Sequence, residues 1–105
     1  MDLKLIITKS PTVEGFRDAI GINVVIPATD IPICGIFVWG QRNADLHIYE
    51  TSLLRTNAQS YIEVIQIAAE LANLLYENNA RSLLDVKKIL RNASKTYARA
   101  ALQVN

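Results

Sequence analysis

The chain has 105 residues, half of them apolar and a fifth of them charged, with a formal net charge of +1. This length supports one small domain over 1–105 with a single core, and the apolar content excludes a disordered chain. The apolar runs are too short to cross a bilayer, which excludes a membrane-spanning protein.

Two features bear on where the protein works. The N-terminus lacks the basic and then apolar pattern of a signal peptide. The single cysteine, Cys34, cannot form an internal disulfide, which fits a reducing compartment. We therefore expect a cytoplasmic protein that has no membrane partner.

The first half of the chain predicts a sheet. Apolar residues either alternate with polar ones or fill short runs in four segments, which turn-forming residues separate. These predicted strands are 3–8, 22–26, 33–39 and 44–49. Between the first two strands, Ser10 and Pro11 are typical of a helix start, and Gly21 would end a short helix after Ile20.

The second half of the chain predicts two helices. Thr56 and Gln59 have the spacing of a capping box, and the apolar residues behind them recur at helical intervals. Asn78 and Asn79 would end this first helix, since asparagine tolerates the left-handed conformation. The polar side of the helix carries three acidic residues spaced by seven positions, which are Glu63, Glu70 and Glu77.

A second helix is expected to start at Ser82, which has the spacing of a capping signal with Asp85. Apolar residues then recur every three or four positions through Val104, and the basic residues lie off this stripe. Only 78–81 separates the two helices, so they should form an αα-hairpin.

The predicted fold is therefore α+β, with a small, mainly antiparallel sheet of three or four strands packed by the C-terminal αα-hairpin. The apolar surface of the two helices exceeds what one small sheet covers, so we expect self-association through the helical half as a two-fold dimer. The expected interface residues are Leu83, Leu90 and Tyr97 of the stripe, together with Trp39, Arg42 and Tyr49 around the predicted hairpin.

Positive charge is concentrated in the last quarter of the chain. Residues 81–105 hold six basic residues and one acidic residue. Those that would lie off the apolar stripe of the second helix are Lys87, Lys88, Arg91, Lys95 and Arg99. Such a row favours a partner with negative charge, either an acidic protein surface or the phosphates of a nucleic acid.

A sharper nucleic-acid hypothesis divides residues 82–103 into a helix-turn-helix. The turn would fall at 91–93, and Lys95, Thr96 and Arg99 would face a groove. Two observations argue against this motif, because the turn lacks the usual glycine and the apolar spacing continues through it unbroken.

Catalysis would have to use Cys34 and His47, which lie on neighbouring predicted strands. Cys34, however, shares a strand face with apolar residues, whereas His47 lies on the polar face of its own strand. A single histidine offers no metal-ligand spacing, and no glycine-rich phosphate loop precedes a helix. We therefore expect no catalytic centre, no metal and no small-molecule cofactor.

The expected function is that of a non-catalytic binding module that acts by surface recognition, as a small protein-binding regulator or inhibitor. A nucleic-acid-binding protein that uses the basic helix is the first alternative. A small enzyme that uses Cys34 and His47 is the second.

Overall fold

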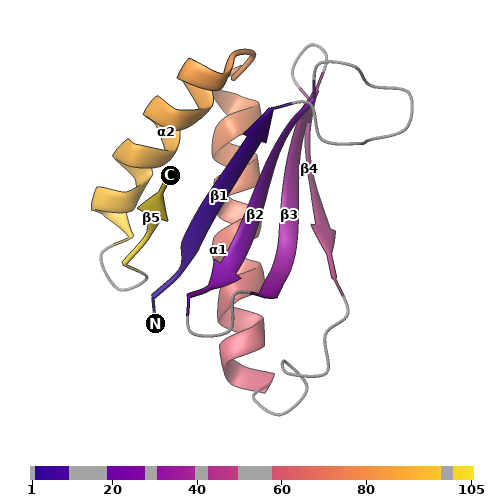
Figure 1. The fold of residues 1–105 in the computed structure, drawn as a ribbon, viewed down its shortest axis with the longest axis vertical. Helices are drawn as coiled ribbons and strands as arrows, with labels where there is room; N and C mark the ends of the chain where they lie inside the picture. Colours follow the sequence, from indigo (N-terminus) through magenta and orange to yellow (C-terminus); the bar gives the residue numbers. More distant parts are fainter. Residues whose placement is uncertain (1, 10–18, 28–30, 40–42, 50–57, 98–100) are drawn as a thin grey trace.

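The structure of the protein, a computed structural model, describes residues 2–9, 19–27, 31–39, 43–49, 58–97 and 101–105. In chain order these residues form β1 (Lys4–Lys9), β2 (Ile20–Ile26), β3 (Ile31–Trp39), β4 (Asn43–Ile48), α1 (Ala58–Glu77), α2 (Leu83–Thr96) and β5 (Gln103–Val104). The strands belong to one sheet in the order β4-β3-β2-β1-β5 (Figure 1).

The first four strands pair in sequence, each antiparallel to the next. One row across the sheet shows the register, because Ile6 lies opposite Asn23, Asn23 opposite Gly35, and Gly35 opposite His47. The mainly antiparallel sheet and the C-terminal helix pair are therefore confirmed. The sheet has one strand more than expected, since β5 pairs parallel with β1.

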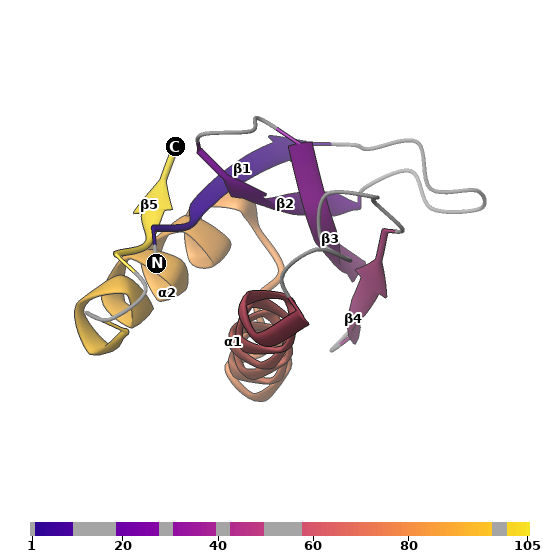
Figure 2. The same cartoon turned by 90° about the horizontal axis from the view of Figure 1, so that it is seen from below.

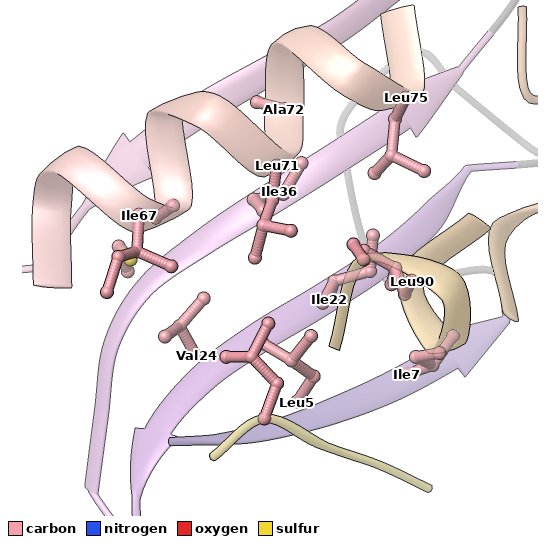
Figure 3. Close-up of a cluster of buried hydrophobic side chains, with 14 of the residues drawn as sticks. Leu5, Ile7, Ile22, Val24, Ile36, Ile67, Leu71, Ala72, Leu75 and Leu90 are labelled. Atoms are coloured by element: carbon pink, nitrogen blue, oxygen red, sulfur yellow. The ribbon is translucent and has the colours of Figure 1, made fainter. Parts of the chain in front are cut away.

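The molecule has two layers, and both helices lie on the same face of the sheet (Figure 2). α1 packs against β3 and β4, α2 packs against β5, and the two helices contact each other. Between the layers, side chains from every second strand residue meet side chains from every third or fourth helix residue. Each fully buried Leu or Ile adds about 1.5–3 kcal/mol to the stability of the folded state. Figure 3 shows part of this core, with Leu5, Ile7, Ile22, Val24 and Ile36 from the sheet and Ile67, Leu71, Ala72, Leu75 and Leu90 from the helices.

α1 ends where the sequence predicts, at its two asparagines. Asn79 adopts a left-handed conformation with φ of 53°. The Ala80 N–H then donates to the Leu75 carbonyl and the Asn79 N–H to the Tyr76 carbonyl, each at 3.1 Å. These two bonds form a Schellman motif and satisfy carbonyls that a helix end otherwise leaves unpaired.

The predicted continuation of the second helix to Val104 is wrong. α2 ends at Thr96, and the chain returns as β5 along the edge of β1. The Gln103 N–H donates to the Leu3 carbonyl at 3.0 Å, and the Ile7 N–H donates to Oδ1 of Asn105 at 2.8 Å. The β1 edge therefore gains hydrogen bonds that a longer α2 would leave unmade.

The short helix predicted before Gly21 is wrong at its C-terminal end. Ile20 and Gly21 belong to β2, where they lie opposite Val38 and Phe37 of β3. Residues 10–18 of that predicted helix, and the capping threonine Thr56, lie outside the described residues.

Candidate functional site: the outer face of α2

The core fixes which face of α2 meets solvent. Val86 and Leu90 are fully buried and Ala93 is nearly so, which places one side of the helix against the sheet and α1. Residues half a turn away from this stripe must therefore point outward.

Local hydrogen bonds fix the start of α2. The Ser82 hydroxyl accepts a hydrogen bond from the Asp85 N–H at 3.1 Å, as an N-cap residue should. Oδ2 of Asp85 in turn accepts a weak bond from the Arg81 N–H at 3.5 Å. The carboxylate of Asp85 also lies in the first turn, where the helix dipole favours negative charge.

The outer face of α2 is a row of one leucine and three cations. Lys88, Arg91 and Lys95 are exposed, and Leu84 is 74% exposed. Their spacings of four, three and four residues align them along one side of the helix. No hydrogen bond or ion pair joins these three basic side chains to another residue in the described part of the chain. We call these four residues the basic row.

The two other basic residues predicted for this surface are not part of the exposed row. Lys87 is half-buried on the flank of α2, and Arg99 lies outside the described residues. The helix-turn-helix is wrong, because residues 91–93, where the turn was expected, lie inside the continuous α2.

Leu84 was missed by the sequence analysis, although the sequence does carry a signal for it. It lies off the stripe of three-four spacing that runs through Val86 and Leu90, in register with Lys88 and Arg91. An apolar residue at such a position is expected to be exposed.

The acidic residues of α1 form a separate surface. Glu63, Glu70 and Glu77 are all exposed and share one side of the helix. Across the part of the chain that the structure describes, none of them is ion-paired with the basic row. The helical layer therefore carries opposite charges on its two helices.

The stripe residues predicted for a dimer interface lie instead against the protein's own core. Leu90 is fully buried, and Leu83 and Tyr97 are half-buried and packed against the core cluster. Leu90 therefore offers no surface to a second copy.

Trp39 and Tyr49, both predicted to lie around the hairpin, do not lie together. Trp39 lies opposite Asn43 at one end of the β3–β4 pair, whereas the Tyr49 N–H donates to the Ile33 carbonyl at the other end, at 2.9 Å. Arg42 lies outside the described residues.

A different aromatic cluster occupies the sheet face opposite the helices. The rings of Phe37 and His47 meet edge to face, with centroids 5.0 Å apart. Gly35 lies beneath them, and Phe37 and the Tyr49 hydroxyl crowd the space that a side chain there would take. Burial, and to a lesser extent the nearby Cys34, raise the pKa of Tyr49.

Cys34 and His47 lie on opposite faces of the sheet. Cys34 belongs to the helix-side core and is fully buried, as its place among apolar residues predicts. Burial raises the pKa of the Cys34 thiol to about 12, whereas a nucleophilic cysteine needs a lowered pKa. Among the described residues, no three His, Cys, Asp or Glu side chains gather in a way that could hold a metal ion.

Comparison with known proteins finds no protein family, no curated protein and no solved structure that matches the chain. Neither described helix is both long and apolar enough to cross a membrane.

Proposed function

We propose that this protein is a non-catalytic binding module, a small regulator or inhibitor that recognises an acidic protein surface through the outer face of α2. The observation that supports it is the basic row, in which an exposed leucine lies at the N-terminal end of three exposed cations that have no hydrogen-bond or ion-pair partner among the described residues. Cations of this kind steer an acidic partner, and an apolar side chain next to them gives the partner a surface to bury.

Two features favour a protein partner over a nucleic acid. Leu84 has no role against a phosphate backbone, which cations neutralise. The neighbouring α1 also presents Glu63, Glu70 and Glu77, which would repel a polyanion that extended across both helices. An acidic protein segment that follows α2 alone avoids this repulsion.

The test is a screen of displayed random peptides against the protein, followed by titration of the selected peptides. We expect selection for acidic residues next to an apolar one. Lys88→Glu should weaken binding about tenfold or more, because it places like charges at the contact. Leu84→Ser should also weaken it, since the apolar contact is lost.

The matched control is Lys9→Glu, which makes the same change of charge at an exposed lysine of β1. It should leave peptide binding unchanged. Peptides that bind Lys88→Glu as well as they bind the wild type would overturn the proposal.

A duplex oligonucleotide titrated at several salt concentrations separates the nucleic-acid alternative. Three results together would identify the partner as a nucleic acid. The oligonucleotide would bind tightly, and each lost cation would flatten the slope of log affinity against log salt concentration by about one unit. Leu84→Ser would leave the affinity for the oligonucleotide unchanged.

A further inference from the structure

β4 is an edge strand whose outer backbone groups have no hydrogen-bond partner among the described residues. The Tyr49 N–H donates to the carbonyl of the directly opposite Ile33, and bonded positions alternate along an antiparallel pair. Asp45 and His47 therefore turn their backbone groups toward β3. Those of the helix-side residues Ala44, Leu46 and Ile48 point outward, where no described residue binds them.

Three features that often prevent pairing between sheets are missing from β4. β4 contains no lysine and no proline, and its register with β3 has no bulge. Beyond β4 no other described element lies in the sheet (Figure 2). A second strand can therefore approach it.

Apolar side chains accompany the open edge. Ile48 is 49% exposed, and Leu46 and Ala44 are half-buried at the margin of the core. The apolar layer thus continues to the edge at which no described residue binds the backbone.

The sequence of β4 is complementary to itself in one antiparallel register. The outward groups of β4 can pair with those of a second β4 when a two-fold axis passes through Asp45, Leu46 or His47. An axis through Asp45 opposes two carboxylates, and an axis through His47 opposes two imidazoles. The axis through Leu46 instead places Asp45 opposite His47 of the other copy, twice.

We propose that two copies of this chain associate through their β4 strands, with the two-fold axis at Leu46, to form one continuous sheet. In this register the backbone groups of Leu46 form hydrogen bonds with those of Leu46 in the second copy, and the backbone groups of Ala44 form hydrogen bonds with those of Ile48 in the second copy. Asp45 and His47 occupy the non-hydrogen-bonded positions between them, where Cα atoms lie only about 4.5 Å apart and side chains are closest. An imidazole N–H can donate to each carboxylate there.

This interface uses no residue of α2. β4 and β5 form opposite edges of the sheet, and α2 packs against β5. The dimer would therefore carry one basic row toward each end, which suits a partner with two acidic segments. Dimerisation through β4 and peptide binding by α2 can therefore fail independently of each other.

Cysteine cross-linking tests the register. In a Cys34→Ala background, Leu46→Cys should form an intermolecular disulfide under mild oxidation, because its two Cα atoms would lie about 5.5 Å apart. Asp45→Cys is the matched control, since its two copies would be offset by two residues along the strand, beyond the reach of about 7 Å. Cross-linking of Asp45→Cys but not of Leu46→Cys would overturn the register.

A charge exchange tests the interface itself, by sedimentation at micromolar concentration. The wild type should be a dimer, and His47→Asp should weaken the dimer about tenfold or more because Asp45 then faces a second carboxylate. The exchange Asp45→His with His47→Asp should restore dimerisation. A monomeric wild type, or a dimer that these changes leave untouched, would refute the proposal.

Discussion

Gly35 is a strand residue whose missing side chain leaves room for two rings. A Cβ at this position would overlap the Tyr49 hydroxyl and would lie 3.0 Å from Cε2 of Phe37. The aromatic cluster on the open face of the sheet therefore depends on glycine in the middle of β3. Since the backbone there is extended, the constraint comes from packing alone.

We predict that Gly35→Ala destabilises the protein by about 1–3 kcal/mol, a cost typical of overpacking. Urea unfolding measures the change. In the Gly35→Ala background, Tyr49→Phe should recover part of the loss, because it removes the hydroxyl that the new methyl group meets. Tyr49→Phe in the wild-type background is the control, and equal effects in both backgrounds would contradict this account.

Cys34 links burial to pH. Burial raises the pKa of its thiol from 9.0 to about 12, so over that interval the unfolded chain loses the proton while the folded chain keeps it. The unfolded state then binds fewer protons, and the free energy of unfolding falls by up to about 1.4 kcal/mol per pH unit as the pH rises. Below about pH 9 this contribution is fully present.

We therefore predict that the wild type loses stability between about pH 9 and pH 11 more steeply than Cys34→Ala does. Other groups also titrate in this range and are common to both proteins, except that Cys34 raises the pKa of Tyr49, so Tyr49→Phe is introduced into both proteins. Urea unfolding at a series of pH values, with the two curves subtracted, isolates the thiol. Parallel curves would mean that Cys34 reaches water in the folded state.

At the scale of the element, the connection from α2 to β5 places an alanine in a conformation that favours glycine. Ala101 has φ of 45°, which costs a residue with a Cβ about 1–2 kcal/mol. The chain accepts this conformation because the following residues complete the edge of β1 and bury Leu102.

We predict that Ala101→Gly raises the free energy of unfolding by about 0.5–1 kcal/mol, since the relief exceeds the entropy that glycine adds to the unfolded chain. Ala69→Gly, within α1, is the matched control and should lower it by about 1 kcal/mol. Thermal unfolding distinguishes the two signs. A loss of stability in both variants would show that the backbone at residue 101 is not under strain.

The elements that local patterns predict are those that local chemistry determines. The four N-terminal strands alternate or run apolar, and Ser82 and Asn79 mark helix boundaries through bonds within a few residues. β5 could not be found in this way. It has two residues, Gln103 and Val104, and its bonds reach the first strand of the chain.

For the candidate site too, the sequence predicts what local spacing determines and not what long-range packing determines. The positions of Lys88, Arg91 and Lys95 follow from helical spacing, and the sequence therefore places them correctly on an exposed face. Helical spacing does not show whether the apolar stripe is buried within the chain or between two copies, because that depends on what packs against it. Leu90 meets the core of its own chain rather than a second copy.

At the scale of the whole molecule, a single core joins all parts of the fold. The buried cluster includes Leu5 of β1, Ile36 of β3, Leu71 of α1 and Leu90 of α2. Within the described residues, each helix packs mainly against the sheet and against the other helix. The helices therefore depend on the sheet, and sheet and helices should unfold together.

We predict one cooperative transition, whichever layer is observed. Trp39, the only tryptophan, reports on β3 through its fluorescence, and circular dichroism at about 222 nm reports on α1 and α2. The two urea curves should coincide in the wild type.

Leu5→Ala, which leaves a cavity where β1 meets the core, should shift both curves together by about 2–5 kcal/mol. Lys9→Ala, an exposed change on the same strand, should shift neither. Fluorescence and helix signals that separate in Leu5→Ala would show that the αα-hairpin persists without the sheet, and the two layers would then be independent units rather than one core.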